Sequence, residues 1–283
     1  SFISLYLLFS IGFRGGQELA HSELSTSVVT AVLTGILSAI IIPIVTFFIL
    51  KKKLGIPNAG AVAAAYGSVS AVTFVTTVAF LEAHNIEFGG HMIAIMAMME
   101  APSIIMGVLL VKIFSKNQEV EMSLGKLLKH SLVSGSVLLI VGSLVIGFVA
   151  TEQQADGIRP FTTELFKGFL AVFLLDMGIT SGKKLSGLWK NGLSPILFAI
   201  ITPLFNGSLM AVFSSFFLDS VGDRLLITIL AASASYIAVP AAMRISVPKA
   251  NPGLYIPMAL AVTFPVNITI GIPIYYQIIQ MCC

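Results

Sequence analysis

Two short clusters of small and hydroxylated residues, one in each half of the chain, have the composition of an anion-binding site. The first is AYGSVSAVT at residues 65–73, and the second is ASASY at residues 232–236, which Pro240 follows. Each cluster interrupts an apolar segment, so we predict that both segments are discontinuous helices. Helix N-termini carry partial positive charge, so two broken helices that cross in mid-membrane can bind an anion between them.

Serine hydroxyls would complete such a site, because no Lys or Arg lies in the centre of a predicted span. The candidate donors are Ser68, Ser70, Ser233 and Ser235. Small residues also let membrane helices pack closely, which is the alternative role for each cluster taken alone. The two clusters occupy matching positions in the two halves of the chain, which favours the anion-binding role over the packing role.

Glu100 lies in the middle of the apolar segment 91–114, where a carboxylate costs several kcal/mol unless it has a partner. Pro102 and Pro265 interrupt their helices and free carbonyl oxygens nearby. Further oxygens would come from Ser103, Thr263, Asn267 and Thr269. Hard cations prefer oxygen ligands, so we predict a Na⁺ site. A proton relay through Glu100 and a simple intrahelical hydrogen bond are the alternatives.

The elements that must position these residues are membrane helices. Hydrophobic residues make up 57% of the 283 residues and charged ones 10%, and the mean hydropathy is +0.98. About 20 apolar residues cross a bilayer as a helix. We predict an all-α polytopic membrane protein with nine spans: 1–18, 26–50, 59–81, 91–114, 126–149, 163–181, 193–217, 224–240 and 254–280. The net charge of +3 is too small and too dispersed to indicate binding to nucleic acid.

The two halves of the chain repeat each other. Residues 5–19 align with residues 171–185, so that Gly12 meets Gly178 and Gly16 meets Gly182, 166 positions later. The alignment continues through both serine clusters, with the offset falling by two positions. An internal repeat in a membrane protein is typical of secondary transporters.

Loop charges predict the orientation. The loops after the second, fourth, sixth and eighth spans hold most of the basic residues, and the opposite loops hold most of the acids. The positive-inside rule therefore places the Lys-rich loops in the cytoplasm. The spans 1–18 and 163–181 then cross in opposite directions, so the repeat is inverted. Because 126–149 has no partner before residue 1, we expect a five-plus-five plan whose first helix is absent from this chain.

The expected domains follow from the repeat. Residues 1–125 form the first repeat, lacking its first helix, and residues 126–283 form the second. A mobile core would comprise 59–114 and 224–280. A gate or scaffold would comprise 1–50 and 126–217.

Four stretches resemble the sodium-dependent bicarbonate transporter family of cyanobacteria and its wider bacterial relatives. They are YGSVSAVTFVTTVAFLE (66–82), the segment around Glu100-Ala101-Pro102, ASASYIAVPAAMRISVPKANPGLYIP (232–257) and VTFPVNITIGIPIYY (262–276). The similarity runs through essentially the whole chain, and the C-terminal motifs are its most specific part. It implies Na⁺-coupled bicarbonate import by an elevator-type mechanism, without an organic cofactor, in a homotrimer in the bacterial inner membrane.

The resemblance also implies which residues bind each substrate. Bicarbonate would lie at the crossing of the broken helices, at Gly67, Ser68, Val69, Ser70, Ala232, Ser233, Ala234 and Ser235. Sodium would lie beside it, at Thr73, Glu100, Ser103, Thr263 and Asn267.

The chain departs from the cyanobacterial pattern in three places. Ala71-Val72 replaces Gly-Ser before Thr73, and Glu100 replaces Asp. These two changes leave the exact anion open. The loop SKNQEVEMSLGK (115–126) is short, which weakens the expectation of a PII-like regulatory partner.

Other functions remain open at this stage. A carrier of another small anion, coupled to Na⁺ or H⁺, would share the broken helices, and so would a cation/proton antiporter, which tends to need carboxylates in both broken regions. An intramembrane zinc protease would need a motif such as HExxH, which is absent, so no enzyme is predicted. His84 and His91, with Glu82 and Glu87, could bind a metal but are expected to be solvated loop residues.

Overall fold

The computed structural model describes residues 2–21, 25–115, 135–189 and 192–282. Within these ranges every regular element is a helix and no strand occurs, so the predicted all-α class is confirmed. The loop 115–126, on which the expectation about a PII-like partner rested, lies outside the described residues except for Ser115. Residues 126–134 of the fifth predicted span also lie outside them.

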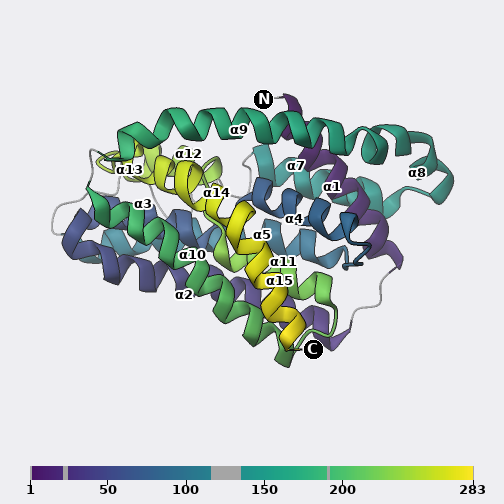
Figure 1. Cartoon of the computed structure of the whole chain (residues 1–283), viewed down its shortest axis with the longest axis horizontal. Helices are drawn as coiled ribbons and strands as arrows, with labels where there is room; N and C mark the ends of the chain where they lie inside the picture. Colours follow the sequence, from purple (N-terminus) through teal and green to yellow (C-terminus); the bar gives the residue numbers. More distant parts are fainter. Residues whose placement is uncertain (1, 22–24, 116–134, 190–191, 283) are drawn as a thin grey trace.

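Figure 1 shows how the helices are arranged, and their bounds follow here in chain order. The first helices are α1 (Phe2–His21), α2 (Thr26–Leu54), α3 (Ile56–Gly67), α4 (Ala71–Ala83) and α5 (His91–Phe114). The next are α7 (Gly135–Val149), α8 (Glu152–Arg159), η1 (Pro160–Glu164), α9 (Phe166–Trp189), α10 (Leu193–Phe213) and η2 (Ser214–Phe216). The last are α11 (Val221–Ala232), α12 (Ala238–Ser246), α13 (Pro252–Pro257), η3 (Met258–Thr263), α14 (Phe264–Val266), η4 (Asn267–Gly271) and α15 (Ile272–Met281).

Six helical stretches of the described residues are long and apolar enough to cross a membrane. They are Thr26–Leu54, Ile56–Ala83, His91–Phe114, Glu152–Trp189, Leu193–Phe216 and Pro252–Met281. Each corresponds to a predicted span. The remaining predictions correspond to α1, to α7 and to the broken pair α11 and α12.

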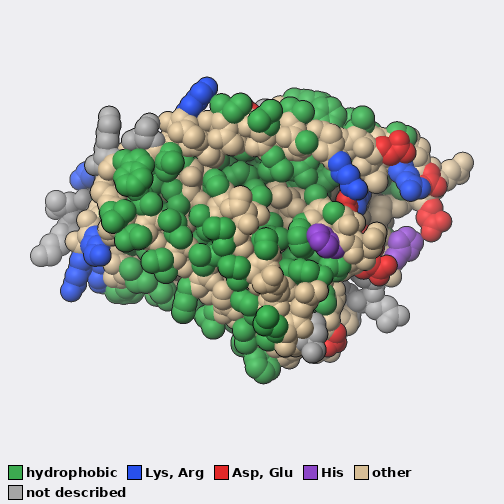
Figure 2. Space-filling model, viewed as in Figure 1, with side chains coloured by type: hydrophobic (Ala, Val, Ile, Leu, Met, Phe, Trp, Pro, Cys, Tyr) green, Lys and Arg blue, Asp and Glu red, His purple; other side chains and the backbone are tan. Residues whose placement is uncertain are grey.

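The surface has an apolar band between two charged ends (Figure 2). Several basic side chains lie at one end of this face, and most of the acidic and histidine side chains lie at the other end, together with further basic side chains. Large apolar side chains of α2 face outward, including Leu33, Leu37, Ile41 and Val45, each more than half exposed. Such a face would be unfavourable in water but suits lipid chains.

Helix α1 packs along α7 at very short range. A Cβ added at Gly16 would overlap the Leu144 carbonyl oxygen of α7, and one added at Gly147 would overlap the Phe13 carbonyl oxygen of α1. Glycine at both positions therefore lets the two backbones touch, as in other membrane-helix pairs with small interface residues.

Most of the remaining helices form a second packing group, and α9 contacts both groups. Helix α2 packs mainly on α3 and α5, and α10 packs mainly on α11, α15 and η3. The division expected from the sequence placed the segments of α2 and α10 in the scaffold with α1 and α7. Their contacts instead group α2 with α3–α5 and α10 with α11–α15.

The half-helices that precede the two breaks lie at the centre of the protein. Residues 59–67 of α3 and residues 222–232 of α11 are buried along their whole length. Five alanines and two glycines in the α3 stretch allow neighbours to approach from every side. Both breaks are therefore held deep inside the fold.

Candidate functional site

Two interrupted helices cross at the centre, and the predicted discontinuities are confirmed. Helix α3 ends at Gly67 and α4 begins at Ala71, while α11 ends at Ala232 and α12 begins at Ala238. The first residue after each break has the same extended backbone. Ser68 has φ −84° and ψ 170°, and Ser233 has φ −86° and ψ 170°.

Hydrogen bonds tie the two breaks to each other. The Ser70 amide donates to the Ser233 hydroxyl at 3.0 Å, and the Ser235 amide donates to the Ala65 carbonyl at 2.8 Å. The Ser70 hydroxyl also caps α4 by accepting from the Thr73 amide at 3.2 Å. The Ser233 and Ser70 hydroxyls therefore serve as hydrogen-bond partners of backbone amides, because breaking a helix leaves amide and carbonyl groups that need partners.

A pocket of about 320 Å³ opens where α4 and α12 begin. The first break contributes Val69, Ser70, Ala71 and Val72, the second contributes Ser235, Tyr236, Ile237, Ala238 and Ala241, and α5 contributes Glu100. The opposite wall is Ser4, Leu5 and Leu8 of α1 with Gly135 of α7. Helix α12 starts without a side-chain cap, so no side chain accepts from its first amide groups. Both N-termini thus direct partial positive charge at the pocket.

The structure divides the predicted bicarbonate residues into two sets. Val69, Ser70 and Ser235 line the pocket. The remaining five, which do not line it, are Gly67, Ser68, Ala232, Ser233 and Ala234. The Ser233 hydroxyl is engaged with the Ser70 amide and with the Leu230 carbonyl at 3.4 Å.

Of the predicted sodium residues, Glu100 lines the pocket and is 6% exposed. The hydroxyl oxygens of Thr73 and Ser68 are fully buried near the first break and have no hydrogen-bond partner. Buried hydroxyls in native proteins are nearly always satisfied, so two unsatisfied ones point to a bound species that supplies the missing contact. Hydroxyl and carboxylate oxygens are ligands suited to a hard cation.

Ser103 and Asn267 each donate to a carbonyl group near the end of the half-helix that precedes a break. The Ser103 hydroxyl donates to the Ala64 carbonyl at 2.9 Å, and the Asn267 side-chain amide donates to the Ala232 carbonyl at 2.9 Å. Ser103 and Asn267 align with each other in the sequence repeat, and they perform the same task on corresponding half-helices. The Asn267 Oδ1 atom also accepts from Tyr275 at 3.1 Å.

Thr263 lies in a buried chain of hydrogen bonds. Its hydroxyl donates to the Ala199 carbonyl at 2.8 Å and is 2.7 Å from the Tyr66 hydroxyl, which is therefore the donor of that pair. The Thr263 hydroxyl therefore uses its proton on one protein partner and accepts a hydrogen bond from another. Sequence reasoning missed Tyr66, Tyr275 and Tyr236 at this centre, although Tyr66 and Tyr236 directly adjoin the serine clusters.

Gly67 serves close packing at the first break. A Cβ added there would overlap the Pro43 ring of α2 and the Ser103 hydroxyl. We therefore expect Gly67→Ala to destabilise the protein by about 1–3 kcal/mol, the usual cost of overpacking. The thermal midpoint in detergent checks this result. Gly142→Ala on α7, where nothing lies within 4 Å of the new Cβ, is the matched control and should leave the midpoint unchanged.

The charged groups at the acidic end pair with each other. Arg14 of α1 forms an ion pair with Glu82 of α4. His91 is 7% exposed and lies 3.6 Å from Asp223, so its expected place as a solvated loop residue is wrong. His91 begins α5, and α11 brings Asp223 to it. No group of three or more His, Cys, Asp or Glu side chains among the described residues is placed to hold a metal ion.

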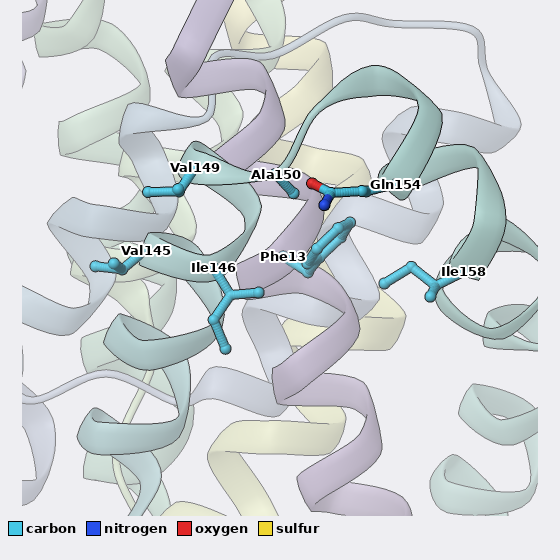
Figure 3. Close-up of a pocket in the computed structure, with 7 residues that line it drawn as sticks. All are labelled: Phe13, Val145, Ile146, Val149, Ala150, Gln154 and Ile158. Atoms are coloured by element: carbon cyan, nitrogen blue, oxygen red, sulfur yellow. The ribbon is translucent and has the colours of Figure 1, made fainter.

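A larger pocket of about 720 Å³ lies away from the crossing, among α1, α7 and α8. In Figure 3 the Phe13 ring lies between Ile146 and Ile158, and Gln154 is the polar side chain among the seven that are drawn. An anion would find one amide group and no charge there. The pocket at the two breaks is the better candidate for a polar substrate.

Comparison with known proteins assigns the family. A search of curated proteins gives no match to the chain. A family model described as the Na⁺-dependent bicarbonate transporter superfamily matches residues 1–280. Together with the apolar helices, this match makes the chain a multi-pass membrane transporter and not an enzyme. The family model spans almost the whole of a chain whose broken helices meet at a buried polar pocket. This chain therefore belongs to the Na⁺-dependent bicarbonate transporter superfamily.

Proposed function

We propose that the protein imports bicarbonate together with Na⁺ by moving the crossing of its broken helices past a gate. The observation that carries this proposal is the pocket between the N-termini of α4 and α12, which presents the Ser70 and Ser235 side chains. Helix N-termini and hydroxyl groups bind a small oxyanion without a cationic side chain. The pocket's volume of about 320 Å³ leaves room for bicarbonate and water.

Sodium binding would make the anion site complete. Glu100 faces the pocket, and the unsatisfied oxygens of Thr73 and Ser68 are buried close to the same break. A cation held by these oxygens offsets the negative charge of Glu100. Bicarbonate can then enter a site that is no longer electrostatically unfavourable, which couples the two substrates. Ser103 keeps a free lone pair for such a cation, whereas the oxygens of Thr263 and Asn267 face protein donors or acceptors.

The packing groups supply the moving parts. The core in this proposal comprises α2–α5 and α10–α15, and the gate comprises α1, α7 and α9. The pocket lies between them, since its walls come from both groups. The Arg14–Glu82 ion pair joins gate and core near the acidic end, and the Ser181 hydroxyl joins them elsewhere by donating to the Leu260 carbonyl at 2.8 Å. These contacts must break or slide when the core moves, as expected for an elevator.

An inverted repeat is part of this proposal. The matching roles of Ser103 and Asn267, and the nearly identical backbone angles of Ser68 and Ser233, are what two copies of one unit in opposite orientations would produce. The Lys-rich end, which includes Lys51, would face the cytoplasm of a bacterial inner membrane. The homotrimer and the PII-like regulator implied by the family resemblance stay predictions.

Uptake into proteoliposomes tests the proposal. Purified protein should accumulate radiolabelled bicarbonate in a saturable way when Na⁺ is supplied outside, and K⁺ in its place should abolish the uptake. The reason is that a bound cation offsets the negative charge of the Glu100 carboxylate that lines the anion pocket. Saturable uptake that is independent of Na⁺ would contradict the coupling. Uptake of another small oxyanion in place of bicarbonate would show that the proposed substrate is wrong, while the assignment of the pocket as the anion site would stand.

A further inference from the structure

Tyr236 lines the same pocket as Ser70, Ser235 and Glu100, but neither the serine motifs nor the repeat singled it out. It lies in the non-helical stretch between α11 and α12, two residues before α12 begins at Ala238. A side chain at this place stands beside the first amide groups of α12. Any anion held by those amides would therefore lie next to Tyr236.

The hydroxyl group of Tyr236 is buried and has no hydrogen-bond partner. It lies beside the Ser70 side chain, which the other break supplies, without making a bond of normal geometry to it. The hydroxyl is thus positioned between the two breaks, on a residue that lines the pocket. Buried donors in native proteins nearly always have a partner, and for a residue that lines the pocket a bound molecule can supply the missing acceptor.

The aromatic ring of Tyr236 is held in place from behind. It packs edge-to-face on Phe264, with the ring centroids 5.9 Å apart and the planes at 67°. This contact, together with the few rotatable bonds of tyrosine, fixes the direction of the hydroxyl before any ligand binds. A pre-positioned donor loses little conformational entropy when a ligand arrives.

The repeat shows that this arrangement belongs to one half of the pocket only. Tyr236 aligns with Ala71, and Phe264 aligns with Glu100. The first half therefore contributes an acid and a small residue, and the second half contributes the tyrosine and the phenylalanine that supports it. Two similar halves thus produce a pocket with a carboxylate on one side and an added hydrogen-bond donor on the other.

We propose that the Tyr236 hydroxyl donates a hydrogen bond to an oxygen of the bound oxyanion and orients it away from the carboxylate side. The inference rests on the proposed function and adds to it a residue that determines affinity. Ser70 and Ser235 stand on both sides by symmetry and cannot distinguish one end of a planar anion from the other. The Tyr236 hydroxyl has no symmetric counterpart, so it can distinguish the two ends of the anion.

The test compares wild-type protein with Tyr236→Phe, which keeps the ring and its packing on Phe264. Sodium-dependent uptake is measured over a range of bicarbonate concentrations, and the thermal midpoint is measured with and without bicarbonate in the presence of Na⁺. We expect the half-saturating bicarbonate concentration to rise about tenfold, equivalent to about 1.4 kcal/mol. The maximal rate should change little, because the lost bond forms with the substrate in every bound state. The stabilisation by bicarbonate should shrink, while the midpoint without ligand stays unchanged or rises.

Tyr255→Phe is the matched control, because the Tyr255 hydroxyl is also buried without a partner but does not line the pocket. It should leave the half-saturating concentration unchanged. A wild-type half-saturating concentration in Tyr236→Phe would overturn the inference. So would a drop in its ligand-free midpoint with unchanged affinity, which would assign the hydroxyl to the fold. If wild-type protein shows neither uptake nor stabilisation by bicarbonate, the proposed function itself fails.

Discussion

Leucine in place of Ser235 or Ser70 abolishes sodium-driven bicarbonate uptake in a protein that still folds: this is the largest effect that we expect. Both serines line the pocket, so a larger apolar side chain would occupy the space between the ends of α4 and α12. It would also remove a hydroxyl donor and bring an apolar surface against the anion. We expect the uptake rate at saturating Na⁺ to fall more than tenfold. A higher bicarbonate concentration should not restore it, because the leucine side chain fills the binding site.

Folding should survive these substitutions for a structural reason. The bond from Ser235 to the Ala65 carbonyl uses the backbone amide, which leucine retains. Ser70→Leu additionally removes the cap on α4, which costs about 1 kcal/mol. Thr269→Leu is the matched control. The sequence suggested Thr269 as an oxygen near the sodium site, but its hydroxyl is exposed on η4, donates to the Pro265 carbonyl at 2.7 Å and does not line the pocket. Uptake by Ser235→Leu at the rate of this control would show that the pocket is not on the transport path.

Glu100→Gln should weaken the dependence of uptake on Na⁺. The variant keeps the size of the side chain but removes the negative charge that faces the pocket. We expect the half-saturating Na⁺ concentration to rise about tenfold or more, which corresponds to losing about 1.4 kcal/mol of cation binding. Uptake measured against Na⁺ concentration at saturating bicarbonate gives this value.

Glu100→Asp serves as the conservative partner of that variant. It retains a carboxylate, so Na⁺ dependence should persist with an intermediate half-saturating concentration. An unchanged Na⁺ response in Glu100→Gln would remove Glu100 from the coupling site. If the variant kept its Na⁺ response but lost a dependence on external pH, the proton relay would be the correct role for this residue.

The moving core that we propose includes α2 and α10, which the sequence analysis assigned to the scaffold. The sequence pattern does not contain the information on helix contacts that this assignment needs. Hydropathy identified the segments of α2 and α10 as spans without saying which neighbours they contact. In the structure α2 lies on α3 and α5, and α10 lies on α11 and α15. Helix partners are chosen by the shapes of their faces, which a hydropathy average does not contain.

By itself, the sequence determined the elements and the chemistry available to this protein. Apolar length specifies membrane helices, since an unpaired backbone group is too costly in lipid, and the small polar clusters mark where two of those helices break. The tertiary structure decided which of those residues meet the substrate. Ser70 and Ser235 line the pocket, whereas Asn267 is committed to a carbonyl of α11 and Thr263 to a carbonyl of α10. These bonds join residues 35 and 64 positions apart, so no local pattern could reveal them. Tyr236 likewise became a candidate only when folding buried its hydroxyl beside Ser70, from the opposite half of the chain.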